Sequence, residues 1–298
     1  MRVEGKAVRK RFARIEALRG IDFAIPSGGK VGLIGPNASG KSTLIRIILG
    51  LLQCEGELLL DGQRRREAEV ADRIAYVPQI APKFSASVDE VVRAITRVRQ
   101  ISTREVLSCG KDVGIDLRAA GAQPFVSLSG GAKQKTLIAL ALASRASFYV
   151  LDEPTASLDT QSRRDLFQLL SDKARDATLI LCSHRLEEIR TLVEQVMVLE
   201  EGRLVYFGPT EDYLDQMTLS TIEVQLKNGA EHRALTEMGF HHRIGEWWSR
   251  TATRSEKLKL VEQVSRHFEG RISNLLVRDA EAVQPEARGS EDDVDQES

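Results

Sequence analysis

Along residues 1–216, short apolar runs alternate with longer segments in which apolar residues recur at helical spacing. The clearest example is the apolar run at 31–34, which glycines bound on both sides and a helical pattern follows over about 41–52. The alternation continues with predicted helices at 88–108, 133–144, 160–174 and 185–193 and predicted strands at 148–151 and 178–182. Buried strands that alternate with helices of this size predict an α/β fold with a mostly parallel sheet.

The pattern changes near Met217. From there the predicted elements are a strand at 221–226, a helix at 230–238, strands at 240–244 and 247–253, a helix at 255–268 and a strand at 271–277. This order, βαββαβ, is close to the split βαβ arrangement of a ferredoxin-like module. We therefore predict a large α/β domain over 1–216 and a small α+β accessory or regulatory domain over 217–278.

Charge is balanced over the whole chain but not at its end. The 298 residues carry 42 Lys and Arg against 43 Asp and Glu. A general nucleic-acid binder usually has a strong basic excess, so we expect no nucleic acid as a partner. Residues 279–298 hold eight acidic residues and one arginine, with two valines as their only large apolar residues. Such a segment cannot bury enough surface to fold by itself, and it predicts an acidic, disordered tail.

Three cysteines, Cys54, Cys109 and Cys182, are scattered along the chain. An odd and dispersed set argues against a disulfide framework and favours a reducing compartment. The most apolar stretch near the start, 44–52, is interrupted by Arg46 and falls far short of the roughly 20 residues that cross a bilayer. We therefore predict a chain that does not span a membrane, so that any membrane role requires a partner.

The segment that follows the 31–34 run matches the phosphate-loop pattern G-x-x-x-x-G-K-[ST], after a strand and at the start of a helix. Its residues are Gly35, Pro36, Asn37, Ala38, Ser39, Gly40, Lys41, Ser42 and Thr43. Glycines let the backbone turn tightly so that its N–H groups face an anion, and the helix N-terminus adds positive potential. We expect Lys41 to reach the β- and γ-phosphates of a nucleotide and the Ser42 hydroxyl to coordinate Mg²⁺.

Two adjacent carboxylates, Asp152 and Glu153, follow the apolar run at 148–151. They are expected at the carboxyl edge of the sheet, where α/β proteins bind their ligands. Asp152 would bind Mg²⁺, directly or through water, and Glu153 would polarise the water that attacks the γ-phosphate. Many strands end in acidic turn residues, so the pair alone is a weak signal. It indicates a nucleotide site because the same chain also contains the phosphate loop.

The segment LSGG at 128–131 opens a predicted helix and forms a second helix start that is suited to binding an anion. With this segment the chain resembles, over roughly 1–216, the nucleotide-binding subunits of ABC transporters, whose signature is LSGGQ. Ala132 stands where the family usually has Gln, and Lys135 stands where Arg is frequent.

In that family, ATP lies between the phosphate loop of one copy and the signature of the other. The resemblance therefore implies that Ser129, Gly130 and Gly131 contact the γ-phosphate in trans. It also implies a P-loop NTPase fold of the ABC ATPase type, with a helical subdomain at about 80–145.

Further residues match the family in the expected order. Gln79 matches the Q-loop glutamine, a ligand of Mg²⁺ and water, and His184 matches the switch histidine that contacts the γ-phosphate. The segment at 157–159 resembles the D-loop, which contacts the opposite copy, although one of its polar residues could equally cap a helix. Phe12 matches the position where the family stacks an aromatic ring on adenine, with core packing as the alternative.

The resemblance implies an ATPase in which Lys41, Glu153 and His184 are catalytic. Two subunits, identical or paralogous, would close around two Mg²⁺–ATP and power a separate transmembrane permease from the cytoplasmic face of the cell (inner) membrane. The small second domain resembles the C-terminal extensions of subunits that pair with such permeases, often in exporters. Two alternatives are an ABC-type mechanotransmission ATPase, which drives assembly or extraction without transport, and a soluble ABC ATPase.

Overall fold

The computed structural model describes residues 1–64, 72–227 and 232–281. The chain forms two compact units, Met1–Thr210 and Glu211–Ser298. The first unit ends at Thr210, whose amide and hydroxyl donate to the carbonyls of Glu194 and Val193. Among the described residues, no helix combines the length and the apolar character that crossing a bilayer requires.

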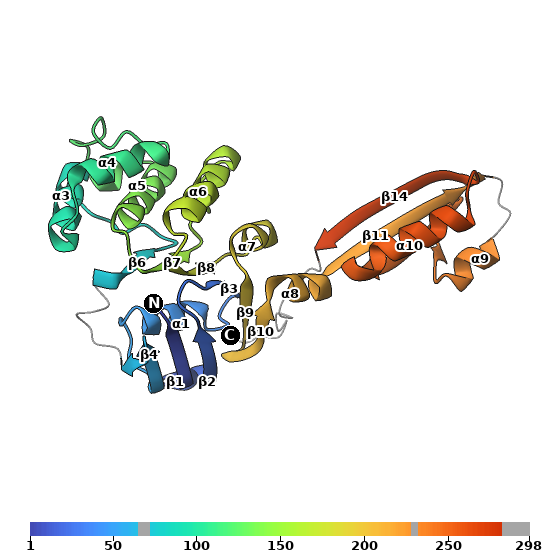
Figure 1. Cartoon of the computed structure of the whole chain (residues 1–298), viewed down its shortest axis with the longest axis horizontal. Coiled ribbons are helices and arrows are strands. Elements are labelled where there is room, and N and C mark those ends of the chain that lie inside the picture. The colour runs from blue at the N-terminus through green and yellow to red at the C-terminus, as the bar shows by residue number, and fades with distance from the viewer. Residues whose placement is uncertain (65–71, 228–231, 282–298) are drawn as a thin grey trace, which may run out of the picture. The chain divides into compact units, whose positions relative to one another are not determined.

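A six-stranded sheet forms the centre of the first unit, in the order β10-β9-β3-β8-β7-β6 (Figure 1). The strands are β3 (Lys30–Ile34), β6 (Ile74–Val77), β7 (Phe148–Asp152), β8 (Thr178–Cys182), β9 (Gln195–Glu200) and β10 (Arg203–Pro209). All neighbours are parallel except β9 and β10, which confirms the predicted mostly parallel α/β fold. The strand that leads into the phosphate loop, β3, lies between β8 and β9.

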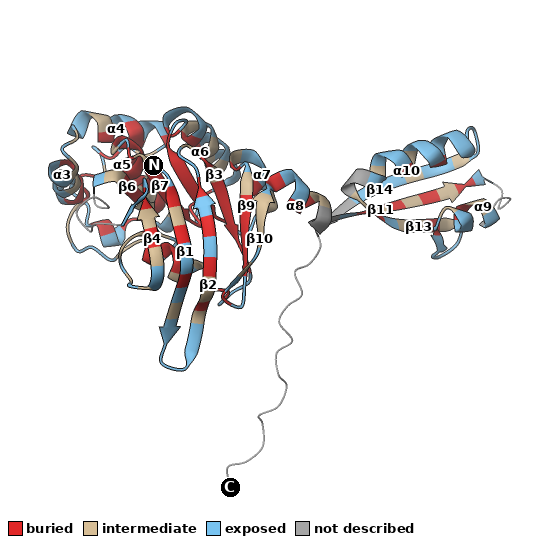
Figure 2. Ribbon diagram, turned by 60° about the horizontal axis from the view of Figure 1, so that its bottom comes forward, coloured by how far each residue is buried: buried red, intermediate tan, exposed pale blue. Residues whose placement is uncertain are grey.

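A second sheet of this unit is antiparallel, in the order β2-β1-β4-β5. It consists of β1 (Val3–Phe12), β2 (Ile15–Ile25), β4 (Glu55–Leu60) and β5 (Gln63–Arg64). The buried side of helix α1 (Lys41–Ile48) joins side chains of both sheets in one core, and buried positions line the strands while the end of the β1–β2 hairpin is exposed (Figure 2). The helix is shorter than predicted because Gly50, with a φ of 81°, ends it.

The helix predicted at 88–108 is wrong as a single element, because the chain forms α3 (Val88–Arg99) and α4 (Thr103–Asp112). Gln100 adopts a left-handed conformation with a φ of 52° and ends α3. Each helix starts at its own capping box, in which a serine and a glutamate three residues later satisfy each other's backbone N–H groups.

The helices α5 (Gly130–Ala143), α6 (Thr160–Lys173) and α7 (Leu186–Leu192) lie close to their predicted positions. A short 3₁₀ helix at Phe125–Ser127, which the sequence did not predict, precedes α5. The helix α5 starts earlier than predicted because the Ser129 side chain caps it, accepting a hydrogen bond of 3.2 Å from the Ala132 amide.

The second unit begins within α8 (Thr210–Met217). Its other elements are β11 (Thr218–Leu226), α9 (His232–Glu237), β12 (His241–His242), β13 (Trp247–Thr253), α10 (Arg254–His267) and β14 (Ile272–Glu281). Its sheet has the order β12-β13-β11-β14 with every neighbouring pair antiparallel, which is the predicted split βαβ arrangement. The predicted disorder from Asp279 onward is wrong for 279–281, because these residues pair with the start of β11. The rest of the predicted tail, 282–298, lies outside the described residues.

Candidate functional site

A cavity of about 200 Å³ opens where the phosphate loop meets the carboxyl ends of β7 and β8. Its lining residues are Ala17, Asn37, Ala38, Ser39, Gly40, Lys41, Ser42, Thr43, Gln79, Asp152, Glu153, Cys182 and His184. The predicted site residues outside this lining are Phe12, Gly35, Pro36, Ser129, Gly130 and Gly131. The fold thus brings together groups that the sequence places in five separate segments.

The tight approach of other chain segments explains the glycines of the phosphate loop. A Cβ at Gly35 would lie 2.2 Å from the carbonyl oxygen of Leu199 in β9, and a Cβ at Gly40 would lie 2.7 Å from that of Ala17 in β2. Gly40, with a φ of 107°, is the N-cap of α1. Neither position can hold a side chain without moving backbone, so the loop is shaped by its neighbours as well as by its own sequence.

Lys41 begins α1 and folds back over the loop. Its Nζ donates to the carbonyl oxygens of Gly35 and Pro36 at 2.6 and 2.8 Å. The ammonium group is therefore held beside the first turn of α1, where backbone N–H groups of the helix have no partner within the helix. Positive charge and free N–H groups at one point make a receptor for a phosphate chain.

Asp152 ends β7, and the hydrogen-bonding side chains of Cys182 in β8 and Tyr76 in β6 lower the pKa of its carboxyl group. Burial raises the pKa of Asp152, and these donors oppose that rise. Burial and the charge of Asp152 raise the pKa of Tyr76 to about 12, so its hydroxyl remains a donor. The carboxylate thus belongs to a strand that lies between the two strands carrying Tyr76 and Cys182.

Glu153 follows directly, with a φ of 47° that a non-glycine residue rarely adopts. Its amide donates to the carbonyl oxygen of Cys182 at 2.9 Å, which holds the turn. Burial, with the nearby charge of Glu188, raises the pKa of Glu153 to about 7. Its Oε1 is buried and has no hydrogen-bond partner within the described chain. A strained backbone and an unpartnered carboxylate oxygen are features of functional sites.

His184 follows β8 and places its Nε2 3.5 Å from Oε1 of Glu153. Burial and the charge of Lys41 lower the pKa of His184, so the imidazole is neutral at pH 7. A neutral ring can donate a hydrogen bond from one nitrogen and accept one at the other. The cavity therefore presents a proton acceptor, Glu153, next to a neutral donor.

The signature segment lies apart from this cavity in the same chain. Ser129 and Gly130 are exposed at the start of α5. A Cβ at Gly131 would lie 2.9 Å from the carbonyl oxygen of Ser157, so the signature packs closely against the segment at 157–159. Asp159 accepts a hydrogen bond of 2.9 Å from the Ser162 amide and caps α6, which confirms that the capping role applies to this segment.

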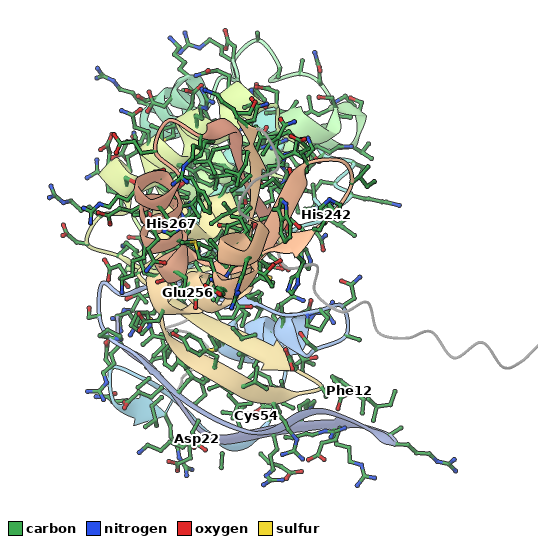
Figure 3. All side chains as sticks on the ribbon, turned by 90° about the vertical axis from the view of Figure 1, so that its right-hand side faces the viewer. Phe12, Asp22, Cys54, His242, Glu256 and His267 are labelled. Carbon is green, nitrogen blue, oxygen red and sulfur yellow. The ribbon has the colours of Figure 1, made fainter. Side chains whose placement is uncertain are left out.

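Phe12 lies at the end of β1, and 43% of its surface is exposed (Figure 3). Core packing, the alternative that the sequence allowed, is wrong for this residue. The Lys10 Nζ lies 5.3 Å from the centre of the Phe12 ring. Ala17 of β2, rather than Phe12, lines the cavity.

Sequence reasoning missed Tyr76, Cys182 and Ala17. No motif marks them, because each reaches the site through strand register rather than through a fixed spacing from the phosphate loop. The signal that could have found Tyr76 and Cys182 is their place at the carboxyl ends of strands beside Asp152, since parallel strands end at one edge.

The oxygen donors of the cavity fit Mg²⁺. The Ser42 hydroxyl, the Gln79 amide and the Asp152 carboxylate belong to one lining, and hard oxygen ligands are those that Mg²⁺ prefers. Across the described residues, no three His, Cys, Asp or Glu side chains converge into a complete metal cage. Mg²⁺ commonly binds in this way, with few protein ligands and with substrate phosphates completing its shell.

Residues 18–156 match the sequence model of the family described as ABC transporter. The chain is 34% identical over 221 residues to the energy-coupling factor transporter ATP-binding protein of Symbiobacterium thermophilum, covering 70% of this chain and 76% of that protein. A dimeric ATP-binding cassette solved with ADP and phosphate is similar with a TM-score of 0.62 and 25% identity, over 70% of this chain and 98% of that one. A bacterial Atm1-family ABC exporter solved with ATP is similar with a TM-score of 0.67 and 28% identity, over 72% of this chain and 40% of that one.

Proposed function

Because this chain belongs to the family of ABC transporter ATP-binding proteins, we propose that its 200 Å³ cavity binds Mg²⁺–ATP and that a second subunit completes each hydrolytic site. The chain is the ATP-binding and ATP-hydrolysing subunit of an ABC system. The observation that carries the site assignment is the convergence of Lys41, Asp152 and Glu153 on one cavity.

The phosphate loop and Lys41 bind the nucleotide in this proposal. The backbone N–H groups of the loop and the first turn of α1 cradle the phosphates, and the Lys41 ammonium group neutralises their charge. Ser42, Gln79 and Asp152 would hold Mg²⁺, which supplies charge neutralisation on the β- and γ-phosphates. Phosphoryl transfer needs mainly such positioning and electrostatic stabilisation.

Glu153 accepts a hydrogen bond from the attacking water and orients it. Its free Oε1 faces His184 across 3.5 Å, so a water near both groups can donate to the carboxylate while the neutral imidazole donates to the γ-phosphate. The raised pKa of Glu153, about 7, suits a group that must take up a proton near neutral pH.

Dimerisation follows from the position of the signature. Ser129 and Gly130 are exposed and do not line the cavity of their own chain, which supports contact with the nucleotide of a second copy or of a paralogous ATPase. A two-fold operation would place each signature over the other phosphate loop. The γ-phosphate then completes contacts on both subunits, whereas ADP cannot.

The partner in this proposal is a transmembrane permease, which this subunit would serve from the cytoplasmic face of the membrane. Opening and closing of the dimer would move the helices α3 and α4, which follow Gln79, and so drive the permease. We propose export as the direction, because the Atm1-family structure is an exporter and the ferredoxin-like unit resembles exporter extensions. A mechanotransmission role remains the second candidate, since the same motion could assemble or extract a membrane component.

Two measurements test this proposal. The ATPase activity per subunit of the purified chain should rise with the concentration of the chain and should depend on Mg²⁺. An activity per subunit that is independent of concentration would contradict the composite site. Purification from native membranes should recover a multi-span protein, and a transport assay on that complex separates export from mechanotransmission. Recovery only from the soluble fraction with bound nucleic acid would contradict a membrane role.

A further inference from the structure

The buried carboxylate of Glu188 connects two loops of the first unit. Its Oε1 accepts a hydrogen bond of 2.6 Å from the Thr155 hydroxyl, and its Oε2 accepts one of 2.7 Å from the Ser183 hydroxyl. All three residues are at least 97% buried. Burying a carboxylate is costly unless it is well hydrogen-bonded, so these two short contacts are strong, charge-assisted bonds.

The two loops carry the residues that the proposed function uses for the attacking water. Thr155 stands two positions after Glu153 in the turn that follows β7, and Ser183 directly precedes His184 after β8. The Ser183 hydroxyl also accepts a hydrogen bond of 3.0 Å from the Arg185 amide, so the turn around His184 is fixed on both sides. Glu188 therefore bridges the backbone segments that set the distance between Glu153 and His184.

A simpler interpretation is that Glu188 only stabilises the start of α7, where acidic residues are favourable. Glu187 occupies the same first turn and is exposed, so it can supply this effect without any cost of burial. The neighbouring glutamates separate the two explanations, because Glu188 alone of this pair bonds to the loops that follow β7 and β8.

We propose that Glu188 is a positioning residue for ATP hydrolysis, which clamps the Thr155 and Ser183 loops together and keeps the Glu153 carboxylate at working distance from His184. This inference rests on the proposed roles of Glu153 and His184. It assigns Glu188 no contact with the nucleotide, because Glu188 does not line the 200 Å³ cavity.

Three variants of the full chain test the clamp. Thr155→Val is isosteric and removes one hydroxyl, Ser183→Ala removes the other, and Glu188→Gln keeps the size of the side chain but replaces one accepting oxygen with an NH₂ group. Glu187→Gln makes the same chemical change on the exposed side of the same helical turn and is the matched control. For each variant, kcat and KM for ATP are measured, with thermal unfolding to verify folding.

We expect Thr155→Val and Ser183→Ala to lower kcat by about tenfold while the affinity for ATP stays within about twofold, as for loss of positioning in the transition state. Glu188→Gln loses one of the two accepting oxygens of the clamp and should also lower kcat while the affinity for ATP stays within about twofold. Glu187→Gln should change neither quantity.

The outcomes distinguish this inference from the function on which it rests. If Glu153→Gln is inactive but Thr155→Val, Ser183→Ala and Glu188→Gln all retain the original kcat, the positioning role of Glu188 is overturned and the site assignment stands. If Glu153→Gln hydrolyses ATP at the original rate, the proposed function itself is overturned. If one hydroxyl variant fails to fold, the other hydroxyl variant decides the clamp.

Discussion

Nε2 of His184 lies 3.5 Å from Oε1 of Glu153, a buried oxygen that accepts no hydrogen bond from the described part of the chain. Because the imidazole is neutral, the contact is not an ion pair. In the proposed function, this oxygen accepts a hydrogen bond from the attacking water.

Glu153→Gln should abolish turnover, with a loss of at least about 100-fold in kcat, because an amide cannot accept the proton of the attacking water. ATP binding should persist, since Lys41 and the phosphate loop are unchanged, and the variant should accumulate as an ATP-bound dimer. Single-turnover ATPase assays and size-exclusion chromatography with ATP measure both effects. A monomeric, fully active variant would show that Glu153 is not the proton acceptor.

The pH dependence of ATP hydrolysis should follow Glu153. Its pKa is about 7 instead of the ordinary 4.5, so kcat should rise as pH increases through about 7 and level off when the carboxylate is ionised. His184, whose pKa is lowered, is already neutral in this range and adds no second rise above pH 7. Steady-state kcat measured across this interval is the test, and a flat profile would refute it.

The same raised pKa predicts an effect on stability. A carboxyl group whose pKa is raised by folding stabilises the folded state below its ordinary pKa of 4.5, and this contribution is lost as pH rises through about 7. Glu153→Gln should therefore raise the free energy of unfolding at pH 8 by on the order of 1–3 kcal/mol, and should have little effect at pH 4. Urea denaturation at both pH values provides the comparison.

Mixing two inactive variants should restore activity if the site is shared between subunits. Lys41→Ala removes the phosphate-binding cation, and Ser129→Asp keeps a good cap on α5 but places negative charge toward the γ-phosphate. Half of the randomly paired dimers then contain one subunit of each variant. In such a dimer, one of the two sites combines an intact phosphate loop with an intact signature, so the mixture should recover up to about a quarter of the original activity. Neither variant alone should recover, and a mixture that stays inactive would argue against sites completed in trans.

Tyr76→Phe should weaken the response to Mg²⁺. The variant loses the hydroxyl that lowers the pKa of Asp152 and keeps the ring that packs against the core. Loss of such an outer-shell partner costs about 10–100-fold in metal affinity, so half-maximal ATPase activity should require correspondingly more Mg²⁺. Tyr206→Phe, at a tyrosine whose hydroxyl donates to Pro209 away from the cavity, is the control.

Phe12→Ala should reduce ATP affinity by about tenfold if the exposed ring stacks on adenine, in line with the energy of aromatic stacking on a base. Ile15→Ala removes an apolar side chain that is 72% exposed at the other side of the same hairpin turn and should not change affinity. Fluorescent-nucleotide titration measures both. Equal affinities for the two variants would remove Phe12 from the nucleotide site.

The sequence predicted the sheet type and the phosphate loop because both depend on local pattern. Glycine spacing and an apolar run place the loop after β3, and Asp152 and Glu153 follow β7 in the same manner. The break at Gln100 was also present in the sequence, as the capping box at Ser102 and Glu105, but helical periodicity on both sides concealed it.

Other features required the fold. The contacts of Asp152 with Tyr76 and Cys182, and of Glu188 with Thr155, join segments that no spacing rule connects. The place of β3 between β8 and β9 is likewise a matter of strand order, which hydrophobic pattern does not encode. The exposed position of Phe12 depends on how far the β1–β2 hairpin extends beyond the core.

The strand order also has a consequence for biosynthesis. β3 ends at Ile34, whereas its two neighbours begin at Thr178 and Gln195. At about 5–20 residues per second, the strand leaves the ribosome on the order of ten seconds before either neighbour exists to pair with it. Bound nucleotide therefore cannot stabilise a nascent chain until nearly the whole first unit has been translated. We expect chaperones to engage the chain during this interval.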